Sequence, residues 1–289
     1  MTRKVTRRTA LGFALAVPAL AAPPVQSAAT SEQLAELERR HGGRLGVAAL
    51  DIGTGRRIGR RADERFPMCS TFKFLAAACV LARVDRKDER LDRRVVFAKG
   101  DLVTYSPVTK KRVGGDGMSV AELCEAAMTL SDNTAANLLL ASFGGPAVLT
   151  AFARSIGDGM TRLDRIETDL NEAAPGDPRD TTTPNAMLDN LARLVLGGTL
   201  SESSRAQLAA WLVGNRTGDT RLRAGFPSGW RVGDKTGSGG NGTANDIAVV
   251  WRPEGAPLVV CAYLTGSPLA PDERNGVIAA VARAVSASL

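Results

Sequence analysis

The sequence has 289 residues with 37 basic and 30 acidic side chains, a formal net charge of +7, and is 44% hydrophobic but only 4% aromatic. A chain of this length can bury a large core, while the scarcity of aromatic residues and the mixed charges argue against nucleic-acid binding. A single histidine, His41, and the lack of a C-x-x-C pair argue against a zinc site. We therefore expect no metal, no organic cofactor and no nucleic-acid partner.

Residues 1–29 are predicted to form a signal peptide. Arg7 and Arg8 precede an apolar stretch, residues 11–22, that is too short for a stop-transfer helix and ends in small residues. The segment has no acidic residue and four basic ones, so most of the net charge would leave with it. The arginine pair favours twin-arginine export, although the general secretory route stays open. We expect a periplasmic or secreted protein without stable membrane association after export.

The rest of the chain, residues 30–289, begins with a predicted helix at 31–40 and a hairpin of two strands at 44–51 and 57–60. In the middle of the chain, apolar residues recur at helical spacing in segments 71–84, 119–130, 133–142, 146–155, 183–196 and 201–213. Strands follow at 230–236, 243–251 and 257–265, before a closing helix at 272–286.

Strands at both ends and helices between them predict a sheet built from the two ends of the chain. Residues 30–65 and 215–289 would form an α/β lobe, and residues 66–214 a helical lobe. Residues 164–180 show little periodicity and contain several turn formers, which indicates a surface loop of a length that usually carries function.

Ser70 and Lys73 stand at the start of the predicted 71–84 helix, which we expect to be amphipathic. Residues three apart lie on one face of a helix, so the pair resembles a serine nucleophile beside an amine that manages its proton. The only histidine, His41, precedes Gly42-Gly43 and is expected to be an exposed residue at the end of a helix. A serine hydrolase here would therefore depend on lysine, a carboxylate or water for proton transfer.

Three further signals accompany this pair. Ser131-Asp132-Asn133 lies between two predicted helices, Lys235-Thr236-Gly237 ends a predicted strand, and Glu167 and Asn171 lie in the 164–180 loop. By average residue usage, each of the first two tripeptides would occur by chance in roughly one chain in twenty. Asp132 is expected to cap the backbone of its link rather than to take part in catalysis.

S-x-x-K, S-D-N and K-T-G together are the signature of class A β-lactamases and penicillin-binding proteins. With the Glu167 loop added, the sequence resembles a class A serine β-lactamase over essentially all of its length after the signal peptide. The resemblance implies a two-lobe β-lactamase/transpeptidase-like α/β fold: a five-stranded antiparallel sheet with flanking helices, and an all-helical lobe. It also implies a monomer that hydrolyses the ring of penicillins and cephalosporins.

The resemblance assigns the acyl-transfer roles to six residues. Ser70 would attack the lactam carbonyl, and the backbone N–H groups of Ser70 and Ser238 would form the oxyanion hole. Ser131, linked to Lys73 and Lys235, would pass a proton to the leaving nitrogen. Lysine as the base for acylation would need its pKa lowered by about three units, or ~4 kcal/mol, so Lys73 and Glu167 both remain candidates for that step.

For deacylation, the resemblance implies that Glu167 and Asn171 hold a water molecule and that Glu167 takes its proton. Arg165 and Asp180 would pair to pin the loop. Substrate-binding groups are expected at Tyr105, Asn133, Arg221, Lys235, Thr236, Gly237 and Ser238. Among them, Arg221 offers a guanidinium suited to a carboxylate.

The chain departs from some family patterns. Ser238 follows the K-T-G tripeptide where one subset has a cysteine paired with the position of Cys69, so that bridge is absent. Cys79 lies two residues beyond the position that would pair with Cys124, about 200° around the helix. We therefore expect mostly free thiols. Thr168 follows Glu167 where many members have proline after a cis peptide, which leaves the geometry of this bond open.

Two other functions share the three motifs. One is a D-alanyl-D-alanine carboxypeptidase or transpeptidase, and the other is a β-lactam sensor domain that is acylated and stays acylated. Glu167 and Asn171 argue against both, because they supply a route for hydrolysis of the acyl-enzyme.

Overall fold

The computed structural model describes residues 25–289, with side chains from residue 29 onward, so most of the predicted signal peptide lies outside the described residues. Its centre is a five-stranded antiparallel sheet in the order β2-β1-β9-β8-β7. The strands are β1 (Arg44–Asp51), β2 (Arg57–Arg60), β7 (Arg231–Gly239), β8 (Thr243–Trp251) and β9 (Leu258–Thr265). The expected sheet from the two ends of the chain is therefore confirmed.

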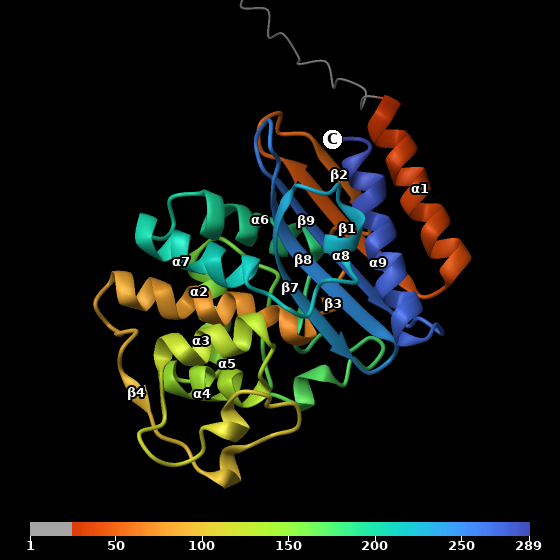
Figure 1. Ribbon diagram of the computed structural model, residues 1–289. Helices are drawn as coiled ribbons and strands as arrows, with labels where there is room; N and C mark the ends of the chain where they lie inside the picture. Colours follow the sequence, from red (N-terminus) through yellow and green to blue (C-terminus); the bar gives the residue numbers. More distant parts are fainter. Residues whose placement is uncertain (1–24) are drawn as a thin grey trace, which may run out of the picture.

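Helices cover both faces of this sheet (Figure 1). On one face, α1 (Val25–His41) and α9 (Pro271–Ser286) lie side by side, and a short α8 (Leu222–Gly225) contacts α9. The other face meets α6 (Pro184–Leu191) and the helical part of the molecule. Those remaining helices are α2 (Phe72–Asp85), α3 (Val120–Thr129), α4 (Asn133–Phe143), α5 (Pro146–Ser155) and α7 (Glu202–Val213).

Strand β9 shows why the sheet lies between two layers. All eight of its residues are buried, because alternate side chains point to opposite faces and each face has a cover. Val260 and Leu264 pack with the α1–α9 side, whereas Val259 and Tyr263 pack with the helical side. The sequence of β9 is accordingly a continuous apolar run rather than an alternating one.

Helix α2 corrects one expectation. Its residues Phe72 to Ala82 are all buried, so the helix is not amphipathic but passes through the middle of the helical part, enclosed by α3, α4, α5 and α7. A helix that is apolar all round is a core helix. Its N-terminal residues therefore lie deep in the molecule.

Several element boundaries also differ from the sequence predictions. Strand β7 continues to Gly239, so Lys235-Thr236-Gly237 lies inside the strand and not at its end. The predicted helix at 183–196 is α-helical only to Leu191 and continues as a π-helix, Ala192–Leu196. The structure adds the two-residue strands β3 (Phe66–Pro67), β4 (Arg94–Val95), β5 (Met118–Ser119) and β6 (Thr181–Thr182).

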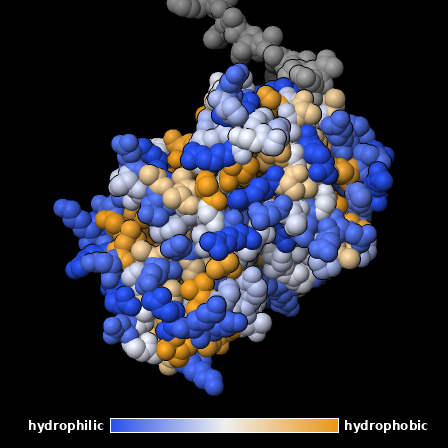
Figure 2. Space-filling view, in the orientation of Figure 1, coloured by the Kyte–Doolittle hydropathy of each residue, from blue (hydrophilic) through white to orange (hydrophobic). Residues whose placement is uncertain are grey.

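The surface carries hydrophilic and hydrophobic side chains interspersed, on the face that Figure 2 shows. Within residues 25–289, no single helix is both long and apolar enough to cross a membrane. Helices α4 and α5 are long and apolar enough only when taken together, and they meet at a bend of 72°.

All four cysteines, Cys69, Cys79, Cys124 and Cys261, are buried free thiols. Burial raises the pKa of the Cys79 thiol to about 11 and raises those of the other three as well. Because the reactive form is the thiolate, the folded protein should react slowly with a thiol reagent. We predict four titratable thiols per chain after denaturation without reductant; a count of two would mean that a disulfide forms.

Candidate active site

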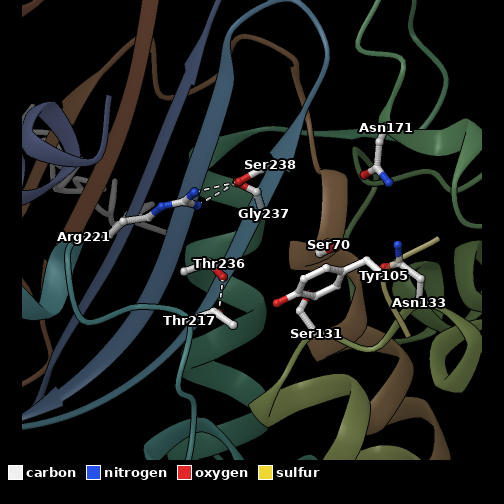
Figure 3. Close-up of a pocket in the computed structure, with 10 residues that line it drawn as sticks. All are labelled: Ser70, Tyr105, Ser131, Asn133, Asn171, Thr217, Arg221, Thr236, Gly237 and Ser238. Carbon is white, nitrogen blue, oxygen red and sulfur yellow. Dashed lines mark hydrogen bonds between the residues drawn. The ribbon is translucent and has the colours of Figure 1, made fainter. Parts of the chain in front are cut away.

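A cavity of about 360 Å³ opens between the helical part and the edge strand β7 (Figure 3). Ser70, Ser131, Asn133 and Tyr105 come from the helical side, and Thr236, Gly237 and Ser238 come from β7. The wall is completed by Asn171, Thr217 and Arg221. The cavity thus brings together residues from all four sequence signals.

Ser70 lies in a turn of 3-10 helix, Cys69–Thr71, immediately before α2. Its hydroxyl donates a hydrogen bond to Oε1 of Glu167 at 3.2 Å. The expected partner was Lys73, but the described residues show no hydrogen bond between Ser70 and Lys73. Oε1 of Glu167 instead contacts both side chains, because it also lies 3.0 Å from Nζ of Lys73.

Lys73 is completely buried, and its ammonium has three close acceptors. Nζ lies 3.0 Å from Oε1 of Glu167, 2.8 Å from the carbonyl oxygen of Ser131 and 2.6 Å from Oδ1 of Asn133. Burial lowers the pKa of Lys73, and the Glu167 carboxylate opposes that effect. An ammonium has three hydrogens to donate, so this environment suits the protonated amine.

Glu167 is held at both its side chain and its backbone. Nδ2 of Asn171 donates to Oε2 of Glu167 at 2.5 Å. Asn137, on α4, accepts from the Glu167 N–H at 2.9 Å and donates to the Glu167 carbonyl at 2.8 Å. The bond from Glu167 to Thr168, left open by the sequence, is cis. Sequence reasoning assigned no role to Asn137, because nothing in the sequence shows that α4 faces the loop.

The loop that carries Glu167 is tied at its base. Nε of Arg165 lies 2.6 Å from Oδ2 of the buried Asp180. The other carboxylate oxygen of Asp180 accepts from the backbone N–H groups of Asp164 and Arg165 at 2.8 and 2.9 Å. A second nitrogen of Arg165, Nη1, lies 2.6 Å from Oε2 of Glu172 in the same loop.

The link between α3 and α4 presents Ser131 to both lysines. Nζ of Lys235 donates to Oγ of Ser131 at 3.0 Å, and Nζ of Lys73 lies 3.4 Å from the same oxygen. Burial and the nearby charge of Lys73 lower the pKa of Lys235 well below its usual value. Asp132 caps α4 at the Ala135 N–H and also accepts from the Thr109 N–H and hydroxyl, which is a structural role.

On β7, Thr236 and Ser238 are two residues apart and therefore share a face. The Thr236 hydroxyl lies 2.5 Å from that of Thr217, and Nη2 of Arg221 donates to Oγ of Ser238 at 2.6 Å. Arg221 also binds the carbonyl oxygens of Gly237 and Asn245 and the side chain of Asn275. Its guanidinium thus reaches the cavity but is already well supplied with acceptors. Thr217 is a lining residue that sequence reasoning missed.

Gly237 lets β7 approach the nucleophile. A Cβ atom there would lie 2.8 Å from the Met68 carbonyl oxygen and 3.2 Å from the Ser70 nitrogen, so any larger residue would push the strand away. At the mouth, Tyr105 is 56% exposed. The Asn133 amide donates to the Thr104 carbonyl at 2.8 Å and has a second hydrogen to offer. Among the described residues, no cluster of His, Cys, Asp and Glu is arranged to hold a metal ion.

Residues 29–289 match the model of the β-lactamase enzyme family. The chain is 49% identical to β-lactamase Toho-1 of Escherichia coli, with 99% of each chain aligned. It is 48% identical to β-lactamase OXY-1 of Klebsiella oxytoca, with 100% of each aligned.

Solved structures give the same result. An ancestral (GNCA) class A β-lactamase superposes with a TM-score of 0.89 at 69% identity, covering 90% of this chain and 100% of that one. A putative class A β-lactamase, PenP from Rhodopseudomonas palustris, also has a TM-score of 0.89, at 66% identity and with the same coverage.

The buried Arg165–Asp180 pair makes a prediction for stability. Asp180→Ala should leave Nε of Arg165 and two backbone N–H groups without their acceptor, and should lower the free energy of unfolding by about 3 kcal/mol. The control is Asp88→Ala, which removes the aspartate of an exposed ion pair with Arg86 and should cost less than about 1 kcal/mol. Urea unfolding of both variants measures the difference; equal effects would contradict the prediction.

Proposed function

The chain belongs to the class A β-lactamase family, and on that premise we propose which of its residues carry out each step of catalysis. The family reaction is hydrolysis of the amide bond in a β-lactam ring, which confers resistance to β-lactam antibiotics, and this protein is an enzyme of that kind. Penicillins and cephalosporins are the substrates we propose for it.

For acylation, Ser70 attacks the lactam carbonyl and Glu167 accepts its proton. The hydrogen bond from Ser70 Oγ to Glu167 Oε1 supports this assignment. Lys73 is a weaker candidate for the base, because its amine already donates to three acceptors, one of them the Glu167 carboxylate. Lys73 instead holds the carboxylate and the Ser131 link in place.

The negative charge that develops on the carbonyl oxygen is bound by the backbone N–H groups of Ser70 and Ser238. Each donor of this kind is worth on the order of 3 kcal/mol in the transition state. Close packing at Gly237 supports the assignment, because it brings β7 against the Ser70 backbone. Ser131, held by Lys235, then passes its hydroxyl proton to the leaving nitrogen and takes one from Lys73. Glu167 passes the proton it took from Ser70 to Lys73, so it is a carboxylate again before deacylation.

For deacylation, Glu167 removes a proton from a water molecule that attacks the acyl carbonyl. The ester bond to Ser70 then breaks, and Glu167 returns the proton to Ser70 Oγ. Asn171 binds the Glu167 carboxylate and Asn137 binds the Glu167 backbone, which together fix the carboxylate relative to Ser70. The single observation that carries the function is this placement of a held carboxylate within reach of the nucleophile.

Substrate is held along β7. Lys235, Thr236 and Ser238 bind its carboxylate, and Arg221 supports that subsite through Ser238. Asn133 donates to the substrate's side-chain amide, and Tyr105 forms a wall of the mouth. A D-alanyl-D-alanine carboxypeptidase or transpeptidase, or a β-lactam sensor domain, would have no use for the Glu167–Asn171 arrangement.

Turnover of nitrocefin and benzylpenicillin tests these roles. The wild-type enzyme should hydrolyse both continuously. Glu167→Ala should be acylated more slowly, with Lys73 as the remaining base for Ser70, and should then accumulate the acyl-enzyme, visible by mass spectrometry, because its release is slowed at least a hundredfold. Glu172→Ala is the matched control, because that carboxylate lies in the same loop but is exposed. A wild-type enzyme that stops after one equivalent would indicate a sensor, and normal turnover by Glu167→Ala would remove Glu167 from the mechanism.

We also propose that residues 1–29 are an export signal for the twin-arginine route and that the mature enzyme, residues 30–289, works as a periplasmic or secreted monomer. The support is the sequence of the segment, with Arg7 and Arg8 before a short apolar stretch. The mature domain would comprise an α/β lobe, about 30–65 and 215–289, and a helical lobe, about 66–214.

Replacing both Arg7 and Arg8 by lysine should abolish export, because the twin-arginine receptor reads the pair itself. Cell fractionation and the size of the processed chain measure the outcome, with Arg3→Lys as the control outside the pair. Undiminished export of the double variant would indicate the general secretory route.

A further inference from the structure

Asn215, between α7 and β7, has its side-chain amide fixed in one orientation. The backbone N–H of Thr217 points at one terminal atom of this amide from 3.0 Å. A backbone N–H can only donate, so that atom is the oxygen, Oδ1. The nitrogen, Nδ2, then faces Oδ2 of Asp234 at 2.6 Å. Asp234 is fully buried and also accepts from Arg223, so the amide has no reason to turn over.

This orientation decides where the hydroxyl hydrogen of Thr217 lies. Oγ1 of Thr217 is 2.8 Å from Oδ1 of Asn215, and an amide oxygen only accepts. Thr217 must therefore donate its one hydroxyl hydrogen to Asn215. What remains on Thr217 Oγ1 is lone pairs.

Those lone pairs face Thr236. The two threonine hydroxyl oxygens are 2.5 Å apart (Figure 3), so one of them must donate to the other. Since the Thr217 hydrogen is already committed, Thr236 is the donor. In the free enzyme its hydrogen therefore points at Thr217, and not at the position that a substrate carboxylate would occupy.

Ser238, two residues along the same strand, has the opposite arrangement. Its hydroxyl oxygen accepts from Nη2 of Arg221 at 2.6 Å, and a guanidinium has no acceptor to offer. The Ser238 hydrogen is consequently free to point into the cavity. Of the two hydroxyls on this face of β7, one is ready to donate to an anion and the other is not.

We propose that Thr217 is a positioning residue for the substrate carboxylate, whose hydroxyl turns from Asn215 to Thr236 when the carboxylate arrives. This rests on the proposed role of Thr236 in binding that carboxylate. Thr236 then donates to the anion while it accepts from Thr217. If the Thr236 hydroxyl turned to the carboxylate and the Thr217 hydroxyl did not turn with it, lone pairs on both threonine oxygens would face each other across 2.5 Å.

The rotation removes the hydrogen from the 2.8 Å contact between Thr217 Oγ1 and Asn215 Oδ1 and places it in the shorter 2.5 Å contact with Thr236, while the Asn215 amide keeps its other partners. Oδ1 of Asn215 still accepts from the Thr217 N–H, and its Nδ2 still donates to Asp234. A hydroxyl that accepts one hydrogen bond becomes a better donor in the next. Thr217 therefore strengthens the hold of Thr236 on a carboxylate without touching the carboxylate itself.

The resting arrangement is tested by neutron diffraction from the deuterium-exchanged free enzyme. The deuteron of Thr236 should lie between the two threonine oxygens, and that of Thr217 should point at Asn215. A Thr236 deuteron directed into the cavity would overturn the proposal. Because no substrate is present, this result does not depend on the reaction the enzyme catalyses.

The bound arrangement is tested by kcat/KM for benzylpenicillin and for its methyl ester, which lacks the negative charge. Thr217→Val keeps the shape but removes the hydroxyl, and should lower the acid-to-ester ratio of kcat/KM about three- to tenfold, the range of one net hydrogen bond. Most of the loss should appear in KM. Thr217→Ser, which keeps the hydroxyl, should restore the ratio.

An unchanged or raised ratio in Thr217→Val, or equal losses for acid and ester, would overturn the proposal, since equal losses would mean a purely structural role. A failure of the proposed function would be different: the wild-type enzyme itself would not hydrolyse benzylpenicillin.

Discussion

The site depends on a pair of opposite charges, Lys73 and Glu167, whose side chains are both fully buried and 3.0 Å apart. Charges withdrawn from water are tolerated only when each is paired and its remaining hydrogen-bonding atoms are satisfied. Here Ser131 and Asn133 complete the surroundings of the amine, and Asn171 those of the carboxylate. The same contacts that make burial possible also fix the reacting groups, so stability and catalysis place demands on one set of atoms.

Strand β7 carries the opposite wall of the cavity. It is one of the two edge strands of the sheet, so one side is free of strand partners and can face the nucleophile, and Gly237 lets it come close. Behind it, the buried Asp234 receives Arg223 and Asn215. Asp234 orients the Asn215 amide, Asn215 accepts from the Thr217 hydroxyl, and Thr217 contacts the Thr236 hydroxyl in the cavity. The buried aspartate thus influences how the hydroxyls of the cavity are oriented in the free enzyme.

Sequence reasoning succeeded where a signal is local. Periodicity located the main helices and strands, and the three short motifs identified five of the ten residues that line the cavity. It failed at the two-residue strands, which are too short to show a period, and at α2, whose burial on every side depends on four neighbouring helices. Asn137 and Thr217 were missed for the same reason: each acts on a residue distant in sequence.

The sequence by itself determined the elements, the family resemblance and the chemical types present, because these follow from residue spacing along the chain. Only the tertiary structure decided which groups pair. It placed Glu167, and not Lys73, against the Ser70 hydroxyl, and it fixed the direction of hydrogen bonding from Asn215 towards the cavity. Hydrogen bonds act over about 3 Å, and no pattern of spacing along a chain specifies distances of that size between segments that meet only on folding.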